Sequence, residues 1–278
     1  MKQAVCYPLL CVAIALLGLS GCLEIPGSEV INSSQGEHLV ERCQRIPLSK
    51  GFSGGVPAEF ELLLWNIHKQ QHVSWQPELT RLAANSDLLL LQEAVNTDEL
   101  VRWFAAQGWQ WQQSVAFRYE GHSAGVLTAA KTSDVYACAI RVPEPAIRIP
   151  KSSLVTLFPR QGSSYPLLVI NIHAINFELG IAAYKQQVNS LLAMSRHYPG
   201  PVIVAGDFNT WSEKRQLLVT TLLHQYKFNE VSFSPDVRTR VFSQPLDHLF
   251  YRGLSVAQSE AIPSSGSDHV PLRIRFTP

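Results

Sequence analysis

The segment Pro201-Val202-Ile203-Val204-Ala205-Gly206-Asp207-Phe208-Asn209-Thr210 is an apolar run that ends in a glycine followed by polar residues. A short Val/Ile-rich run bounded by Pro and Gly is typical of a strand covered on both faces. Gly206 lets the backbone turn where the strand stops, so Asp207 and Asn209 can face a ligand from one side. A simpler interpretation is that both residues cap the next helix, and the segment alone leaves both open.

The chain has 278 residues, of which 46% are hydrophobic, and a formal net charge of +1. These values predict a globular protein with one large domain. Near-neutral charge argues against a protein that coats nucleic acid nonspecifically, although a local basic groove would not change the total.

The N-terminus has the pattern of an export signal over residues 1–21. A positive charge at Lys2 precedes an apolar run over residues 4–19, which closes with Leu19-Ser20-Gly21-Cys22. These four residues resemble the bacterial lipobox, which implies that Cys22 is lipidated and starts the mature protein. An uncleaved transmembrane anchor is the alternative, because the run is nearly long enough to span a bilayer. With Leu23 next, we expect a lipid-anchored envelope protein, held at the outer membrane and facing the periplasm.

Residues 22–59 are rich in Ser, Gly, Pro and charge, and we interpret them as a tether with one short ordered piece around residues 38–45. Cys43 and Cys138 remain after the signal and Cys22 are set aside. Two thiols in an oxidising compartment can pair, or they can be two separate buried cysteines. The sequence leaves both open.

A single folded domain is expected over residues 60–278. Apolar runs predict buried strands, and residues recurring at helical spacing between Pro/Gly stops predict helices. The strands are expected at residues 60–68, 87–93, 165–174, 201–207, 246–251 and 271–276, with shorter ones around 109–115, 123–130, 133–142, 153–158 and 261. The helices are expected at residues 75–84, 97–106, 177–197 and 212–225.

Several of these strands end in polar residues, and the motifs at their ends follow a recognisable order. They are Asn66, Gln92-Glu93, Asn171-Ile172-His173, Gly206-Asp207-Phe208-Asn209, Leu246-Asp247-His248 and Ser267-Asp268-His269. Each is a weak signal alone, but six in order with matching strand contexts are specific. The set resembles the endonuclease/exonuclease/phosphatase (DNase I-like) family from about residue 60 to the end. The opening Trp65-Asn66-Ile67-His68-Lys69-Gln70-Gln71 is similar to a poorly characterised bacterial subgroup of it.

The resemblance implies an α/β (α+β) fold: a four-layer sandwich of two mixed β-sheets flanked by helices, with the site at one edge. It implies that Glu93 is the principal ligand of Mg²⁺, with Mn²⁺ as a substitute, and that Asn66 and Asp268 lie close to the ion. Carboxylate and amide oxygens suit such a hard cation.

The resemblance also assigns the catalytic residues. Asp207 would orient or deprotonate the attacking water, and Asn209 would hold Asp207 or a phosphate oxygen. Asp247 and His269 would pair, the carboxylate fixing the tautomer of the imidazole and stabilising its cation. His173 would donate a hydrogen bond or proton near the scissile phosphate. In nuclease members an acid pairs with the equivalent histidine, and here Glu120 and Glu144 are the candidates, without motif support.

Each of these residues also has a structural interpretation: His173 as a strand-end histidine, Asn66 as a turn former, Asp247 as a partner of a surface cation. Trp65 and Trp211 flank the expected site, where they either stack on a base or sugar or belong to the core. Lys69, Arg148 and Lys151 either clamp phosphate or form solvated surface, and we favour the surface.

The leading functional interpretation is a monomeric, Mg²⁺-dependent phosphodiesterase that acts on nucleic acid or another phosphodiester outside the cytoplasm. The first alternative is a phosphatase or a lipid- or inositol-phosphate phosphodiesterase of the same family. The second is a catalytically silent binding lipoprotein.

Overall fold

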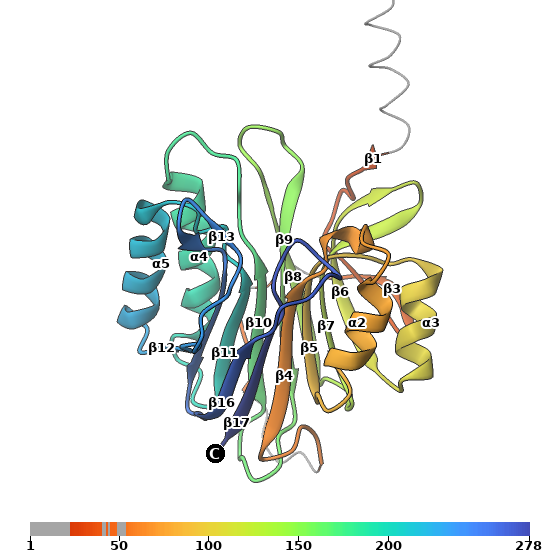
Figure 1. Ribbon diagram of the computed structural model, residues 1–278, viewed down its shortest axis with the longest axis vertical. Helices are drawn as coiled ribbons and strands as arrows, with labels where there is room; N and C mark the ends of the chain where they lie inside the picture. Colours follow the sequence, from red (N-terminus) through yellow and green to blue (C-terminus); the bar gives the residue numbers. More distant parts are fainter. Residues whose placement is uncertain (1–22, 41–42, 44, 49–53) are drawn as a thin grey trace, which may run out of the picture.

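The computed structural model describes residues 23–40, 43, 45–48 and 54–278, and it is built around two β-sheets packed face to face (Figure 1). The larger sheet has nine strands in the order β16-β17-β4-β5-β7-β6-β2-β3, with β1 paired to β6. Its strands are β1 (Leu23–Glu24), β2 (Val30–Ser33), β3 (Gly36–Leu39), β4 (Phe60–Asn66), β5 (Leu88–Val95), β6 (Gln110–Tyr119), β7 (His122–Ala130), β16 (Ser255–Ala261) and β17 (Leu272–Thr277).

The smaller sheet has six strands in the order β12-β15-β11-β10-β9-β8. They are β8 (Tyr136–Pro143), β9 (Pro150–Phe158), β10 (Leu167–His173), β11 (Val202–Asp207), β12 (Asn229–Glu230) and β15 (Asp247–Arg252). A separate hairpin is formed by β13 (Arg240–Val241) and β14 (Gln244–Pro245).

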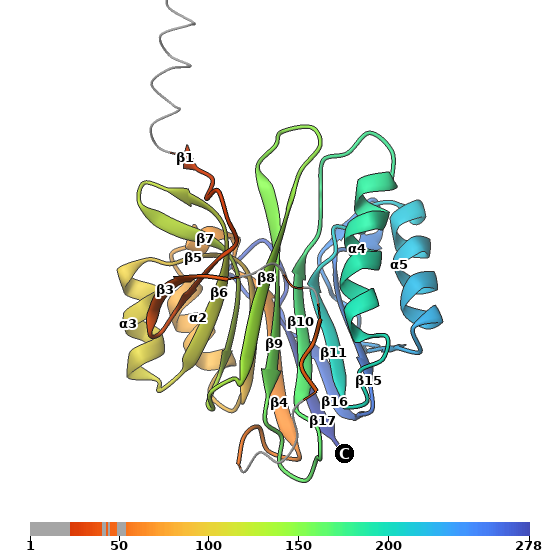
Figure 2. The same cartoon turned by 180° about the vertical axis from the view of Figure 1, so that it is seen from behind.

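Helices cover the outer faces of both sheets, which completes the expected four-layer sandwich (Figures 1 and 2). One pair, α2 (Trp75–Leu82) and α3 (Asp98–Ala106), packs on the nine-stranded sheet through Trp75, Leu79 and Trp103. The other pair, α4 (Ala182–Ser195) and α5 (Glu213–Gln225), packs on the six-stranded sheet. Within the described chain, no helix is long and apolar enough to cross a membrane.

Parallel pairing brings the ends of four strands to one end of the sandwich, called here the reactive end. Strands β4 and β5 run parallel, as do β10 and β11, where His173 lies beside Asp207. A hydrogen bond between Gln92 and Asn171 joins the two sheets there, with Gln92 Nε2 donating to Asn171 Oδ1 at 2.7 Å. Polar strand ends of both sheets therefore converge, as expected.

The starts of helices α3 and α4 were predicted with different success. The side chain of Thr97 accepts from Leu100 N, so the predicted cap of α3 is confirmed. Helix α4 was expected from Phe177, and this start is wrong by five residues. Instead, the Glu178 carboxylate accepts from the N–H groups of Ala183 and Tyr184 and caps the helix there, which leaves residues 174–181 as a loop at the reactive end.

The expected tether over residues 22–59 is the main correction to the domain boundaries. Strands β1 and β2 pair with β6, so the domain includes residues assigned to the tether. Arg118 holds this edge by binding Glu24 and Glu37, each at 2.6 Å. These strands, of two and four residues, are too short for a periodic pattern to reveal them. The signal over residues 1–21 and Cys22 lie outside the described residues.

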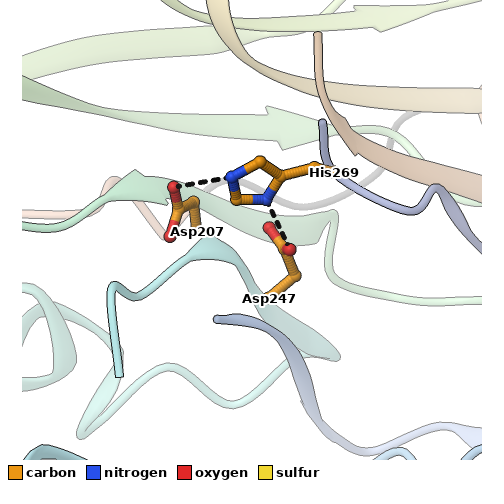
Figure 3. A group of neighbouring side chains, drawn as sticks. All are labelled: Asp207, Asp247 and His269. Atoms are coloured by element: carbon orange, nitrogen blue, oxygen red, sulfur yellow. Dashed lines mark hydrogen bonds and ion pairs between the residues drawn. The ribbon is translucent and has the colours of Figure 1, made fainter. Parts of the chain in front are cut away.

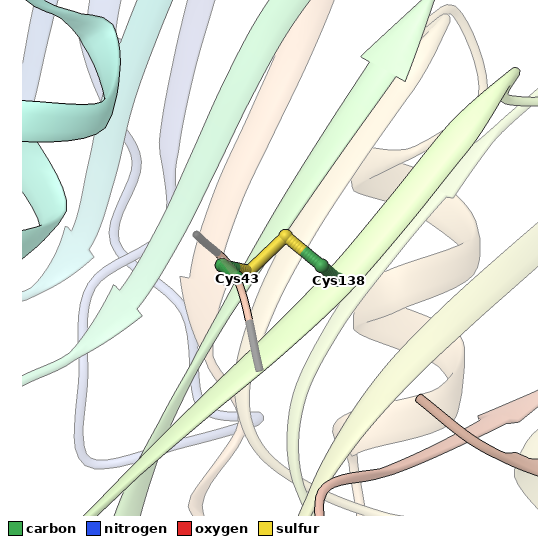
Figure 4. Close-up of a disulfide and its surroundings, with 2 residues drawn as sticks. All are labelled: Cys43 and Cys138. Atoms are coloured by element: carbon green, nitrogen blue, oxygen red, sulfur yellow. A yellow bond between two sulfur atoms is a disulfide. The ribbon is translucent and has the colours of Figure 1, made fainter. Parts of the chain in front are cut away.

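Cys43 and Cys138 form a disulfide that ties this N-terminal segment to β8, with 5.3 Å between their Cα atoms (Figure 4). The two cysteines are therefore paired, and not two separate buried thiols, which the sequence had left open. Among the described residues, all four hydrophobic clusters consist of residues from Ile31 onward, so the chain starting at Leu23 contains each of these clusters.

Candidate active site

Glycine at position 206 lets β10 and β11 approach closely enough to set Asp207 beside His173. Gly206 has φ of 148°, and a Cβ atom there would lie 1.9 Å from the carbonyl oxygen of Ile172. Asp207, which follows, has both oxygens fixed. Oδ2 accepts from Asn66 Nδ2 at 3.0 Å, and Oδ1 accepts from Asn209 N at 2.9 Å. The conformation of the Asp207 carboxylate is therefore set by two neighbours, and Asn209 holds Asp207 as expected.

His269 lies between Asp207 and Asp247 in a buried group (Figure 3). His269 Nδ1 donates to Asp247 Oδ2 at 2.7 Å, and His269 Nε2 lies 3.9 Å from Asp207 Oδ2. Trp65, which is core, donates from Nε1 to the carbonyl oxygen of His269 at 2.9 Å and fixes its backbone. The expected pair of Asp247 and His269 is thus formed.

The imidazole of His269 is held as a cation. Burial alone would lower the pKa of His269, but the charge and hydrogen bond of Asp247, together with the charge of Asp207, raise it to about 10. Both ring nitrogens therefore carry protons at neutral pH and face carboxylates. The group of Asp207, Asp247 and His269 has the composition of a metal site. Within this group the ring acts as a hydrogen-bond donor, because its Nδ1 bonds to Asp247 Oδ2.

His173 lies on the other side of Asp207, with Nε2 at 3.5 Å from Asp207 Oδ2 and 3.8 Å from Glu93 Oε1. Lys151 Nζ donates to this Nε2 at 2.8 Å. Burial and then the positive charge of Lys151 lower the pKa of His173 to about 4, against the opposing charges of Asp207 and Glu93. His173 is therefore a neutral acceptor, and Lys151 holds the cationic position.

Neither carboxylate considered as a partner of His173 makes direct contact with it. Glu120 lies in the exposed turn between β6 and β7. Glu144 accepts from the N–H groups of Asn176 and Phe177, each at 2.9 Å, and reaches Lys151 Nζ at 3.8 Å. Glu144 thus supports Lys151 and the loop that follows His173. Solvated surface was favoured for Lys151 over a phosphate clamp, and this is wrong, because its side chain is only 19% exposed and donates to His173. A lysine at the start of β9 carries no motif that would have shown this.

Glu93 is aimed into the site by an irregularity in β5. The register between β5 and β7 shifts between Leu91 and Ala94, and Glu93 has φ of 52°. Bulges of this kind redirect a side chain, and strained residues concentrate at functional sites. Lys69, in the turn η1 (His68–Gln70), forms an ion pair with the carboxylate of Glu93. Burial opposes ionisation, but the charge that His173 carries at acid pH and the charges of Lys151 and Lys69 lower the pKa of Glu93 to about 2.

The other two expected metal ligands, Asn66 and Asp268, differ in how far their side chains are already bound to neighbouring residues. Asn66 turns its Nδ2 to Asp207, and its Oδ1 accepts from His68 N at 3.0 Å. Asp268 has a half-exposed side chain, 3.5 Å from His68 Nδ1.

Arg148 is exposed at the tip between β8 and β9, as expected for solvated surface. Trp211 donates from Nε1 to Asn176 Oδ1 and lines the cavity.

These side chains share one cavity of about 440 Å³, lined among others by Glu93, Lys151, His173, Asp207 and His269. The arrangement offers an ionised carboxylate, a cationic imidazole, a lysine and a fixed aspartate around one volume. Such a set can bind a phosphoryl group and orient water against it.

Comparison with known proteins agrees with this fold. The model of the Endonuclease/Exonuclease/phosphatase family matches residues 63–269, and the chain belongs to this family. Its members are generally hydrolases acting on phosphoesters, and they generally use divalent metals.

Relatives with assigned names carry the designation UPF0294. A UPF0294 protein of Vibrio cholerae is 42% identical over 274 residues, which cover 97% of this chain and 96% of that protein. One of Vibrio vulnificus is 48% identical over 217 residues, 78% of this chain and 76% of that protein. The solved structure of ANGEL2, described as a 2',3'-cyclic phosphatase, aligns with a TM-score of 0.63 at 14% identity, covering 84% of this chain and 99% of that one. That likeness concerns the fold.

Proposed function

We propose that the protein is a Mg²⁺-dependent phosphodiesterase that hydrolyses its substrate by in-line attack of water. The observation that carries the proposal is the position of Asp207, fixed by Asn66 and Asn209, between a cationic His269 and a neutral His173. In-line attack on a phosphodiester needs an oriented water on one side and positive charge around the phosphoryl oxygens.

The residues of the chain divide this work. Asp207 accepts a hydrogen bond from the attacking water and takes its proton. His269 donates from Nε2 to a phosphoryl oxygen as negative charge develops, while Asp247 keeps the ring charged and oriented. Lys151 supplies a second cation beside His173. This ammonium group takes the role of hydrogen-bond donor that was expected of His173.

Glu93 is the residue best suited to hold the divalent cation, with Asn66 and Asp268 beside it. Its carboxylate stays ionised because of its surroundings, and oxygen donors suit Mg²⁺ or Mn²⁺. When bound, such an ion supplies Lewis-acid stabilisation of the charge on the phosphoryl oxygens.

The test is hydrolysis of a chromogenic phosphodiester by purified protein starting at Leu23, with Mg²⁺ or Mn²⁺ and with excess EDTA. Activity should require the metal. Glu93→Gln should raise the metal concentration needed for half-maximal activity by at least tenfold. Glu213→Gln, on exposed helix α5, is the matched control. Full activity in EDTA would overturn the metal assignment, and no hydrolysis of any diester would favour the silent binding lipoprotein.

A substrate panel separates the leading function from its alternative within the family. Plasmid DNA, RNA, phospholipids and inositol phosphates should be offered at equal concentration with Mg²⁺. Cleavage of phosphomonoesters alone would favour a phosphatase over the phosphodiesterase proposed here.

We also propose that the mature protein is a monomer anchored in the cell envelope, at the outer membrane, through a lipid on Cys22. The proposal rests on the lipobox residues 19–22. Cys22→Ser should move the protein from the membrane fraction to the soluble periplasm or leave an unprocessed precursor. Unchanged membrane retention with normal processing would contradict it.

A further inference from the structure

A second pocket, of about 360 Å³, opens from the reactive cavity on the side of Glu93 and His173. Its walls are mainly apolar, with Phe117, Ile147, Ile149 and Phe177 as the largest side chains; these four residues define the apolar pocket. Lys69, Glu93, Lys151 and His173 line both volumes, so a group in the apolar pocket would be attached close to the reacting phosphate.

Polar side chains in the walls of the apolar pocket are turned towards the protein. The Ser152 hydroxyl donates to Ser114 O and accepts from Val126 N, both at 3.1 Å. The carboxylate of Glu144 accepts from two backbone N–H groups. A nucleobase is read through hydrogen bonds to its edge, whereas an alkyl chain needs none. The walls therefore suit an alkyl chain better.

Exposed apolar side chains continue from the apolar pocket around the mouth of the site. They come from three loops at the reactive end and define the apolar rim: Ile147, Phe177, Leu179, Val241 and Phe242. Leu179 is fully exposed and Phe242 is 81% exposed. The first two loops touch, with Ala146 N donating to Phe177 O at 3.4 Å. Gathered apolar side chains at the mouth of a site mark a surface that binds a partner or a membrane.

The N-terminal strand leaves the domain at the same end. Leu23 pairs with Tyr119 at the tip of the β6–β7 hairpin, and β7 starts beside the end of β5, with Val95 opposite Ala124. Leu23 therefore lies roughly 7 Å beyond the end of β5 along the strand direction. Figures 1 and 2 show β1 at the upper end, opposite the C-terminus. A lipid on Cys22 would be one residue from this position.

We propose that the reactive end docks on a lipid bilayer, and that the substrate is a membrane phospholipid whose acyl chain enters the apolar pocket. The substrate part of this inference rests on the proposed function. In the reaction, the oxygen of water forms the new P–O bond. The P–O bond to one ester oxygen breaks, and that oxygen takes a proton and leaves as an alcohol. Strand β1 is paired to β6 and directly follows the proposed lipidated residue Cys22, so it keeps the site close to the membrane.

Charge around the two pockets argues against a polynucleotide as the substrate. A nucleic-acid groove needs several lysines or arginines along the backbone path. The two lysines that line both pockets, Lys69 and Lys151, are already engaged with Glu93 and His173. A phospholipid presents a single phosphate and needs no such series of cations.

The docking surface is tested by co-sedimentation of protein starting at Leu23 with vesicles of phosphatidylethanolamine and phosphatidylglycerol. This protein lacks Cys22, so its binding reports the apolar rim. Leu179→Ser should weaken vesicle binding by about tenfold, as expected for one exposed leucine that becomes buried. Leu48→Ser is the matched control, because Leu48 is exposed beside the C-terminal end of α4, away from the reactive end. Equal binding of both variants and wild type, or no vesicle binding at all, would overturn the proposal.

The apolar pocket is tested with soluble phosphodiesters that share one chromogenic leaving group and carry an alkyl arm of increasing length. The kcat/KM value should rise by about threefold or more for each methylene that enters the pocket. Ile147→Ser, a change at a half-exposed wall residue, should flatten this rise. A rate independent of alkyl length, or a strong preference for a nucleoside arm, would overturn the lipid substrate.

The two failures are distinguishable. Metal-dependent hydrolysis of the methyl ester without any dependence on alkyl length would contradict the inference and leave the phosphodiesterase standing. Absence of hydrolysis for every ester would contradict the proposed function and the lipid substrate with it, while vesicle binding would still decide the docking surface.

Discussion

Two histidines flank Asp207, and their surroundings give them opposite charge states. His269 faces Asp247 and Asp207, and its pKa is raised to about 10. His173 meets Lys151, and its pKa is lowered to about 4. The comparison teaches that residue type alone does not assign a role here. The ring of His269 is a cationic hydrogen-bond donor. The ring of His173 is a neutral acceptor, and Lys151 carries the positive charge on that side of Asp207.

The largest expected effect follows from removing the cationic ring. His269→Ala should lower kcat for a chromogenic phosphodiester by about 10²-fold to 10⁴-fold, because the interaction strengthens as charge develops in the transition state. KM should change less than kcat. Steady-state kinetics at saturating metal measure both. His197→Ala, in the exposed turn after α4, is the matched control, and near-wild-type turnover of folded His269→Ala would make the ring structural.

An intermediate effect is expected from the side of His173, when its partner Lys151 is replaced. Lys151→Gln should lower kcat by about 10-fold to 100-fold, since a cation beside the phosphate is lost. It should also raise the pKa of His173 from about 4, because Lys151 is the charge that lowers it after burial. The acid limb of the pH–rate profile would then move to higher pH. Lys185→Gln, on the exposed surface of α4, should change neither quantity; an unchanged acid limb in Lys151→Gln would refute the assignment.

The smallest effect is on stability, and it has opposite signs for the two rings. His173 has a pKa lowered from 6.5, so its contribution is present above pH 6.5 and is lost as pH falls towards 4. His269 has a raised pKa, so its contribution is present below pH 6.5 and is lost as pH rises towards 10. Each slope is at most about 1.4 kcal/mol per pH unit.

Urea denaturation between pH 4 and 10 measures these slopes. His173→Gln should remove the acid-side slope and keep the alkaline one, and His269→Gln should do the reverse. Identical pH dependence in both variants would mean that the two rings do not differ in charge as described.

Much of the fold was predictable because its strands are apolar runs that end in polar residues. The Asp207 strand, its neighbour ending at His173 and the capping of α3 by Thr97 follow from local patterns. Strands β1, β2 and β3 were missed, because two to four residues in a polar segment carry no periodicity.

The site was predictable as a set of residues, since the strand-end motifs converge in the structure. The charge states were not predictable. They depend on Lys151, 22 residues before His173 in the chain, and on the irregularity in β5 that turns Glu93 towards it. Such contacts between distant segments leave no local pattern. The apolar rim was missed for the same reason, as its residues come from three separate loops.

The pH–rate profile of wild type against Asp247→Asn, at saturating Mg²⁺, tests whether a cationic His269 drives turnover. The carboxylate of Asp247 is the main charge that raises the pKa of His269, so its loss should lower that pKa. Wild type should keep its turnover to about pH 9, whereas folded Asp247→Asn should lose activity at markedly lower pH. The same alkaline limb in both proteins would contradict the account.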